Sequence, residues 1–172
     1  RRWCIVGHWP VTLYHPHVPS AAPLLAEGRH IASIDGGCSL KVDGQLNALV
    51  LPERPGGAFS WFAYDGLPTA TALDPQAPSA DSVNIRWGRN ALEVLERGAE
   101  LSLCRHLETG RVLEVLTEYL YVDRGVTRCE DSTDYRLAVR PGDTLSVVRR
   151  ISDRALVKKD GVTGWYFGRL AH

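Results

Sequence analysis

Residues 157–165, VKKDGVTGW, carry the clearest local structural signal in the chain. The pair Asp160-Gly161 accepts the positive φ angles of a two-residue hairpin turn, and apolar residues flank it on both sides. Residues 40–44, LKVDG, repeat the pattern of an apolar strand that runs into Asp-Gly. Both segments therefore predict β-hairpins, and we expect an all-β protein.

Working outward, residues 144–148 (TLSVV) and 99–103 (AELSL) alternate between apolar and polar side chains, which is typical of half-buried strands. Gly56-Gly57 marks a further turn. Residues 91–97 (ALEVLER) instead predict one short helix, because Asn90 before them and Gly98 after them are good helix caps.

Residues 111–121 (RVLEVLTEYLY) fit a helix or a strand by periodicity alone, and an internal repeat favours strands. A shift of 70 aligns residues 12–34 with 82–104 without gaps. Two shorter matches follow from other shifts: GAELSL at 98–103 resembles GDTLSV at 142–147, and SWF at 60–62 resembles GWY at 164–166. The common order of these fragments predicts repeated β units, in which Gly28, Gly98 and Gly142 take equivalent turn positions before a strand.

This order resembles the bacterial SH3 (SH3b) family. Residues 83–90, VNIRWGRN, are similar to the opening segment of that family, and residues 160–165, DGVTGW, are similar to its closing hairpin and strand. Residues 13–16 (LYHP) depart from the opening pattern, and no opening is recognisable after residue 132. The resemblance implies small five-stranded barrels with an aromatic groove.

The expected organisation is therefore two to three tandem SH3-like units. Residues 68–80, PTATALDPQAPSA, contain three prolines and few core residues, which predicts an exposed linker. We expect one unit at 1–67, a second at 81–131 and a third at 132–172; the alternative is that the last two are merged into one unit.

The composition excludes several classes of partner. Lys+Arg and Asp+Glu are both 20, so the net charge of zero gives no general attraction to nucleic acid or to an anionic membrane. No apolar run approaches the ~20 residues of a membrane-spanning helix. The chain has no Met, which suggests a processed or cut N-terminus, and the sequence does not fix a compartment. The resemblance favours an extracellular or cell-envelope location over a cytoplasmic one.

The four cysteines, Cys4, Cys38, Cys104 and Cys129, form no CxxC pair. They can form two disulfides or remain buried thiols, and the sequence does not decide between these. His8, His15 and His17 are close enough in sequence to suggest a metal site, but no other ligand lies at a suitable spacing. No nucleophile elbow, phosphate loop or dinucleotide motif is present, so we expect no catalytic residue, no metal and no cofactor.

Aromatic residues are the most informative type. Trp is frequent in this chain, with five residues, and clusters where the units end. Exposed rings beside a groove suit stacking on a peptide or a sugar. The predicted ligand-binding residues are Tyr14, Trp61, Phe62, Tyr64, Trp87, Trp165 and Tyr166. Because neighbours in a strand face opposite ways, Trp61 and Trp165 are expected to be buried and Phe62 and Tyr166 to be exposed.

The sequence thus favours a non-catalytic binding or targeting module for a peptide, peptidoglycan or protein partner, of the kind that bacterial cell-wall proteins carry. Two alternatives remain. One is a single larger β-barrel enzyme or small-ligand carrier with an interior cavity, and the other is a structural assembly domain that pairs through exposed strand edges.

Overall fold

The structure is a computed structural model that describes residues 2–54 and 56–171, and it confirms the all-β class. The described elements are short strands and three single-turn 3-10 helices. In chain order they are β1 (Cys4–Val6), η1 (Val11–Tyr14), β2 (Leu24–Ala26), η2 (Glu27–Arg29), β3 (Ile31–Ser33), β4 (Leu46–Val50), β5 (Ser60–Tyr64), β6 (Thr69–Ala72), β7 (Asn84–Ile85), β8 (Leu92–Glu96), β9 (Leu101–His106), β10 (Val112–Leu116), η3 (Thr117–Tyr119), β11 (Leu120–Asp123), β12 (Val126–Cys129), β13 (Ser132–Thr133), β14 (Thr144–Arg150), β15 (Ala155–Lys159), β16 (Val162–Tyr166) and β17 (Leu170–Ala171).

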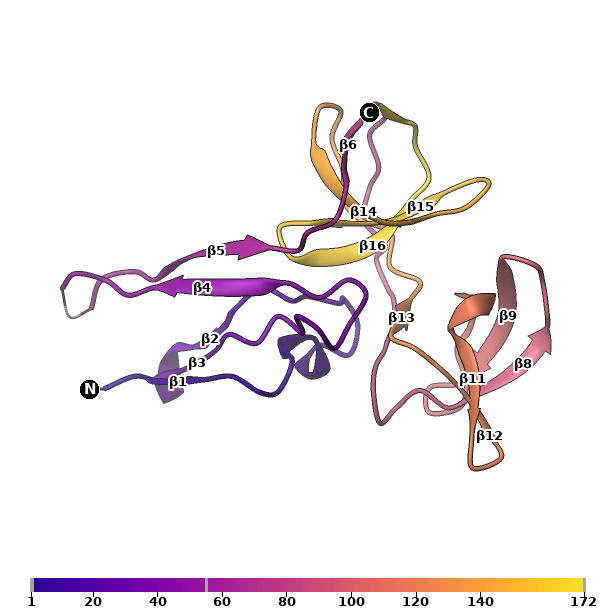
Figure 1. Cartoon of the computed structure of the whole chain (residues 1–172), viewed down its shortest axis with the longest axis horizontal. Helices are drawn as coiled ribbons and strands as arrows, with labels where there is room; N and C mark the ends of the chain where they lie inside the picture. Colours follow the sequence, from indigo (N-terminus) through magenta and orange to yellow (C-terminus); the bar gives the residue numbers. More distant parts are fainter. Residues whose placement is uncertain (1, 55, 172) are drawn as a thin grey trace.

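The strands gather into three bodies. Figure 1 shows the N-terminal body in indigo to magenta, the middle body in pink to orange, and the C-terminal body in light orange and yellow together with β6 in magenta. The N-terminal body, residues 2–67, contains the sheet β1-β3-β2 and the separate hairpin β4-β5. Strand β1 pairs with β3 in parallel, and β2 pairs with β3 antiparallel. The hairpin extends as a long arm beside the small sheet (Figure 1).

The middle body, residues 82–133, consists of the antiparallel sheet β10-β9-β8, the hairpin β11-β12 and the short pair β13-β7. The pair β13-β7 joins the two ends of this body, because Thr133 lies opposite Asn84. Its core contains Ile85, Cys104 and Val115. Alternate residues of β9 are buried, but they are Ser102, Cys104 and His106, whereas Leu103 on the opposite face is exposed. The strand predicted at residues 99–103 is therefore present, and its apolar face is not the buried one.

The C-terminal body is a five-stranded sheet in the order β16-β15-β14-β6-β17. Strand β6 comes from the segment that the sequence predicted to be a linker, so that prediction is wrong for residues 69–72. Ala70 and Ala72 are buried in the core of this body, and Gln76 Nε2 donates to the carbonyl oxygens of Leu137 and Trp165, both at 2.7 Å. The segment has few large core residues, but the small side chains on one face of β6 allow this strand to pack closely against the core of the C-terminal body.

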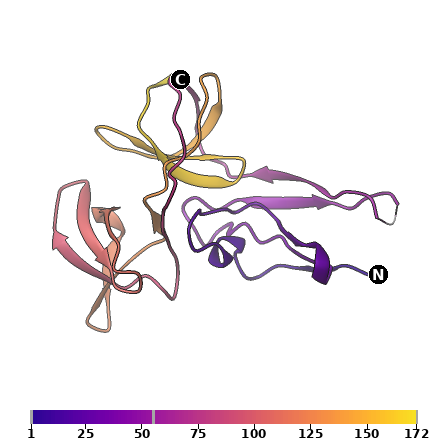
Figure 2. The ribbon, with the colours of Figure 1, turned by 180° about the vertical axis from the view of Figure 1, so that it is seen from behind.

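The middle body is consequently inserted into the C-terminal body between β6 and β14. Figure 2 shows from behind how the chain leaves β6 and descends to the middle body before it returns. Residues 68–80 therefore belong to the same body as residues 134–171, and no closed barrel is present in the part of the chain that the structure describes.

Two further expectations differ from the structure. Residues 91–97 are not helical: β8 spans Leu92–Glu96, because pairing with β9 outweighs the local helix caps. The first Asp-Gly pair, Asp43-Gly44, closes an irregular loop before β4 and no hairpin. The second is correct: Asp160 and Gly161 have φ angles of 52° and 79° and connect β15 to β16.

The repeat glycines share a place in the chain order but differ in conformation. Each precedes a strand: Gly28 precedes β3, Gly98 precedes β9 and Gly142 precedes β14. Of the three, Gly142 has a positive φ, of 89°, and Gly98 lies so close to the carbonyl of Leu101 that a Cβ atom would clash. The sequence alignment therefore predicts the order of these glycines and strands along the chain, but it does not predict one common turn conformation.

All four cysteines are free thiols. Cys104 and Cys129 are buried in the middle body, whereas Cys4 and Cys38 are exposed. Burial raises the pKa of Cys104, and it raises the pKa of Cys129 to about 12. Both buried thiols therefore remain protonated near neutral pH and are poor nucleophiles.

We expect an aromatic disulfide reagent at about pH 8 to label two thiols rapidly in the folded protein and all four after denaturation. Peptide mapping should place the rapid label on Cys4 and Cys38. Fewer than four titratable thiols in denaturant, without a reductant, would show that a disulfide is present instead.

Candidate functional site

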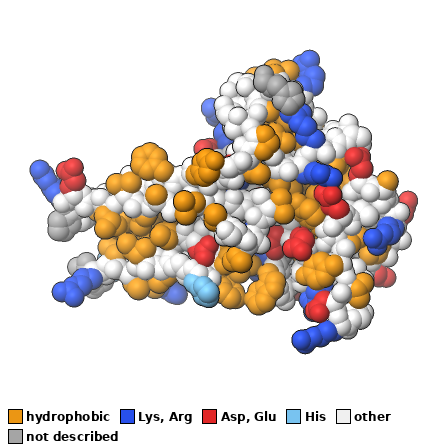
Figure 3. All heavy atoms as spheres, viewed as in Figure 1, with side chains coloured by type: hydrophobic (Ala, Val, Ile, Leu, Met, Phe, Trp, Pro, Cys, Tyr) orange, Lys and Arg blue, Asp and Glu red, His pale blue; other side chains and the backbone are white. Residues whose placement is uncertain are grey.

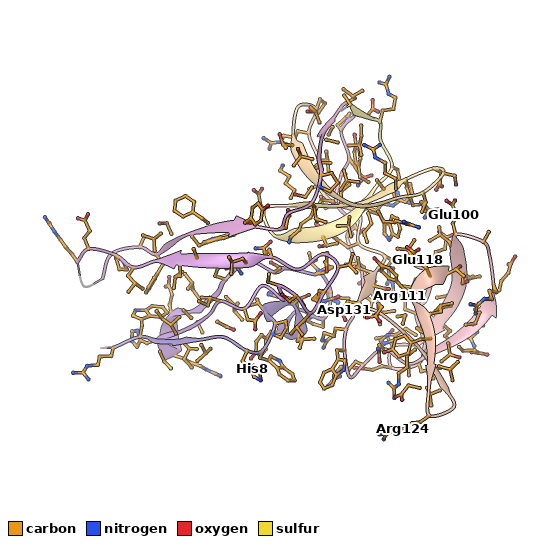
Figure 4. The ribbon with its side chains drawn as sticks, in the orientation of Figure 1. His8, Glu100, Arg111, Glu118, Arg124 and Asp131 are labelled. Atoms are coloured by element: carbon orange, nitrogen blue, oxygen red, sulfur yellow. The ribbon has the colours of Figure 1, made fainter. Side chains whose placement is uncertain are left out.

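The three bodies meet around one cavity of about 420 Å³. Each body contributes to its lining. The lining includes His8, Trp9, Leu40, Lys41, Val42 and Asp43 from the N-terminal body; Asn84, Trp87, Glu114, Tyr119, Tyr121, Glu130 and Asp131 from the middle body; and Leu156, Thr163 and Trp165 from the C-terminal body. In Figure 4, Asp131 lies where the N-terminal and middle bodies meet, and His8 lies on the N-terminal side. A cavity of this volume is in the range that binds small molecules or peptide side chains.

An ion-pair network connects the bodies at this cavity. Lys41 Nζ lies 3.2 Å from Asp43 Oδ1 and 2.8 Å from Asp131 Oδ2, so it joins the N-terminal and middle bodies. Asp43 also accepts a hydrogen bond of 2.6 Å from Thr163 Oγ1 of the C-terminal body. Its backbone carbonyl accepts another, of 2.8 Å, from Lys158 Nζ. Lys41 and Asp43 together therefore connect the three bodies: Lys41 contacts the middle body, and Asp43 contacts the C-terminal body.

Burial and charge act in opposite directions on these groups. Burial alone raises the pKa of Asp43, but the Lys41 ammonium and the Thr163 hydroxyl lower it to a net value below its ordinary range. Burial alone lowers the pKa of Lys41, while the two carboxylates raise it to a net value above its ordinary range. Both groups are consequently charged across the neutral pH range, and the pair stabilises the folded state there.

We expect Asp43→Asn to lower the free energy of unfolding by about 1–3 kcal/mol at neutral pH, because Lys41 loses one of its two carboxylates. Since folding depresses the pKa of Asp43, its contribution is full above the unfolded pKa of about 4 and is lost as the pH falls through the folded pKa. The stabilities of wild type and variant should therefore converge below about pH 4. Urea titrations from pH 7 to pH 2.5 measure this, with the exposed Glu27→Gln as the control; a pH-independent difference would contradict it.

Aromatic rings stand at the mouth of the cavity. The rings of Trp9 and Trp87 form an edge-to-face pair, with centroids 6.0 Å apart and an interplanar angle of 78°. Both are exposed, Trp87 by 67%. The backbone N–H of Trp87 donates to Asp131 Oδ1 at 3.0 Å, so the loop that carries this ring is fixed to the ion-pair network. The exposed side chains of Leu40 and Val42 continue the apolar rim.

The inner wall is more enclosed. Trp165 is only 5% exposed, and its Nε1 donates to the Thr133 carbonyl at 2.8 Å. Tyr119 is half-buried, and burial together with the nearby Asp43 carboxylate raises the pKa of its hydroxyl to about 12. That hydroxyl is therefore neutral at physiological pH. The wall thus offers flat apolar faces with few exposed polar atoms.

A second, more open groove follows β5. Trp61, Phe62 and Tyr64 line it together with Lys158 and Asp65. Register places Tyr64 opposite Leu46 and Phe62 opposite Ala48, so these four residues share one face of the hairpin β4-β5. Phe62 is 70% exposed and Tyr64 is 74% exposed. Trp61 lies on the other face and is half-buried.

The structure divides the seven predicted binding residues into three groups. Trp87 and Trp165 line the cavity, and Trp61, Phe62 and Tyr64 line the groove along β5. Tyr14 is exposed on η1 but lines neither. Tyr166 is fully buried, and its expected exposure is wrong: β16 packs Tyr166 into the C-terminal core, while Trp165 on its other face closes the cavity. Both faces of this strand are covered, so alternation does not expose either ring.

Several residues of the cavity could not be predicted from the sequence. Trp9 belongs to no repeat match, and residues 130 and 131 appear in the sequence as one of many carboxylate pairs. The pattern of residues 40–44 predicts a turn at Asp43 and gives no sign of an ion pair. The frequency of Trp was the one signal in the sequence that pointed to this region.

The described residues contain no group of three or more His, Cys, Asp or Glu side chains that could hold a metal ion. His8 lies at the cavity, whereas His17 Nδ1 lies 3.1 Å from the Ser82 carbonyl oxygen, so the N-terminal histidines do not converge. Cys104 and His106 share the buried face of β9. The His106 ring nitrogens contact Thr109 Oγ1 and the Arg89 carbonyl, both at 2.9 Å, and neither contacts the thiol.

Comparison with known proteins adds no relative: no family model, no curated protein and no solved structure matches this chain. Among the described residues, no helix is long and apolar enough to cross a membrane.

Proposed function

We propose that this chain is a non-catalytic binding module that holds a peptide, peptidoglycan or protein partner through the aromatic cavity and the groove along β5. The observation that carries the proposal is the pairing of concave surfaces with exposed rings, above all Trp87 at the cavity mouth. Flat rings cover a large area and lose little rotamer entropy, so Trp and Tyr dominate binding energies at interfaces.

We also propose that the middle and C-terminal bodies are SH3-like units, as the resemblance to the SH3b family implies. Two features support this. Gly98 and Gly142 precede β9 and β14, the strands that the sequence repeat aligns. The hairpin at Asp160-Gly161 and the Gly164-Trp165 strand follow in the family's order. On this proposal one unit is inserted into the other.

The alternative of one large β-barrel with an interior ligand is less well supported. The cavity lies between three bodies, and its lining carries aromatic and aliphatic side chains more than paired acid and base groups. The barrel alternative places its ligand in the interior of one closed sheet, whereas recognition of a partner needs an accessible mouth.

Sedimentation with purified peptidoglycan and binding to a peptide array test the proposal. We expect the wild-type chain to bind one of the two ligand classes, and we expect Trp87→Ala or Tyr64→Ala to weaken that binding by roughly 2 kcal/mol, or about 30-fold, with little loss of stability. Tyr14→Ala is the matched control, because Tyr14 is an exposed ring outside both concave surfaces.

Two outcomes would contradict the proposal. One is binding that neither Trp87→Ala nor Tyr64→Ala weakens relative to the Tyr14→Ala control. The other is chemical conversion of the bound ligand, which would support the enzyme alternative. A dispersed NMR spectrum of each variant shows that lost binding does not reflect unfolding.

A further inference from the structure

The lining of the cavity carries an excess of negative charge. Its carboxylates are Asp43, Glu114, Glu130 and Asp131, and Lys41 is its one Lys or Arg side chain. Lys41 is already paired with two of these carboxylates. In Figure 3, acidic side chains lie in the middle of this face with hydrophobic side chains on either side.

The remaining two carboxylates differ in their partners. Glu114 lies 2.7 Å from Arg154, a residue outside the lining. Glu130 forms no ion pair with any residue that the structure describes. Lys158, also outside the lining, donates to the Asp43 carbonyl and lies 3.8 Å from Asp65. With Arg154 and Lys158 both counted, the four carboxylates exceed the cations by one, so a cationic ligand would gain attraction here and an anionic ligand would be repelled.

The polar atoms of the wall also select for a donor. Asn84 is 99% buried, and its Nδ2 donates to the carbonyl oxygens of Thr12 and His15, at 3.1 and 2.7 Å. Its Oδ1 accepts no hydrogen bond from any described residue. The carboxylate of Glu130 is likewise an acceptor, and the Lys41 ammonium, the cation of the lining, is already paired. The donors of a ligand therefore find free acceptors in Asn84 and Glu130.

Aromatic rings complete the recognition of a cation. The faces of Trp rings carry negative electrostatic potential, and a cation within about 6 Å of a ring centroid is attracted to it. Trp9 and Trp87 stand at the mouth, and Tyr121 lies nearby in the lining. The apolar side chains of Leu40 and Val42 can cover the methylene stem that leads to the charged group.

We propose, on the basis of the binding function above, that the cavity receives the cationic side chain of an arginine or lysine residue presented by an extended peptide segment. The ammonium and guanidinium groups are donors without acceptors, which matches Asn84 and Glu130. The methylene stem lies along the apolar rim, and the charged group faces Trp87 and the carboxylates. The cavity volume of about 420 Å³ exceeds that of one side chain and admits the flanking backbone.

Two pairs of peptides test the proposal on the full chain. Acetyl-Gly-Gly-Arg-Gly-Gly-amide is compared with its citrulline analogue, and the lysine peptide with its norleucine analogue. Citrulline keeps the length of the arginine side chain, norleucine keeps the four carbons of the lysine side chain, and both remove the charge. NMR titration of the five Trp indole resonances measures binding in the millimolar range. We expect both cationic peptides to shift two indole resonances, those of Trp9 and Trp87, and each neutral analogue to bind at least 10-fold more weakly.

Variants locate the site. Glu130→Gln should weaken binding of the cationic peptides about threefold to tenfold, and Trp87→Ala should abolish the shifts of the Trp9 resonance. Glu93→Gln is the matched control: it removes the same charge from β8, where Glu93 pairs with Arg105 outside the cavity. Higher salt should reduce the affinity of the cationic peptides.

Equal binding of charged and neutral peptides would overturn the charge selection while leaving the aromatic binding function intact. If Glu130→Gln and Glu93→Gln weaken binding of the cationic peptides equally, the attraction comes from the net charge of the protein and not from the cavity. That result would also overturn the proposal. If no peptide binds but peptidoglycan is still retained through Trp87, the cation proposal fails and the proposed function stands.

Discussion

Tyr166→Ala is expected to destabilise the protein by about 3–5 kcal/mol, because the substitution empties the centre of the C-terminal core. The ring is fully buried in a cluster with Leu145 and Val157. Its hydroxyl accepts a hydrogen bond of 3.0 Å from the Asp74 N–H and donates to the Asp74 carbonyl at 2.8 Å. Tyr166 thereby attaches the segment after β6 to the sheet.

Two matched variants separate the contributions of the ring. Tyr166→Phe keeps the ring and removes the hydroxyl, so it should cost about 1–3 kcal/mol by leaving the backbone groups of Asp74 unpaired. Phe62→Ala removes an exposed ring and should change stability by about 0.5 kcal/mol or less. Urea unfolding of the three variants gives these values. A small cost for Tyr166→Ala, similar to that for Phe62→Ala, would show that the ring is not in the core.

Ala72→Asp is expected to abolish cooperative unfolding of the C-terminal body. Ala72 is 1% exposed and faces the core from β6, the strand that joins β14 to β17. A carboxylate at this position would be buried without a partner, at a cost of several kcal/mol, which is comparable to the total stability of a small domain.

The neighbouring position provides the control. Thr71 lies on the opposite, exposed face of β6, so Thr71→Asp should change stability much less than Ala72→Asp. Thermal melts and NMR spectra of the full chain compare the two. Equal melts for wild type and Ala72→Asp would mean that residues 69–72 are an exposed linker after all.

Local patterns predicted the hairpin at Asp160-Gly161 and the strand at 144–148 correctly, and they failed for the hairpin at Asp43-Gly44. The turn at Asp160-Gly161 is the clearest example, because the positive φ angles that it needs are intrinsic to these residue types. The segment 91–97 shows the limit of this reasoning. Its caps and apolar spacing are helical, yet pairing with β9 determines its conformation, and pairing is not visible in a local window.

Long-range arrangement was hardest to predict. Three prolines in residues 68–80 suggested a linker, but none of them lies within β6 itself, so the strand keeps its ladder hydrogen bonds. The candidate site shows the same limit. The sequence predicted Trp87 as a binding residue, whereas Trp9, Lys41 and Asp131 come together only because the N-terminal and middle bodies meet. Residues so far apart in the sequence form no local motif, so a sequence pattern cannot predict this junction.

The insertion of the middle body between β6 and β14 also determines when the C-terminal body can form during synthesis. Thr71 of β6 pairs with Thr144 of β14, which the ribosome adds roughly seventy residues later, several seconds at ordinary elongation rates. The middle body contains all of its own strands and can fold in that interval. Until β14 and β17 emerge, β6 has no partner strand on either side, and both of its edges are open to pairing with another chain. During the synthesis of residues 73–143, β6 is therefore a strand with two open edges at which the nascent chain can aggregate.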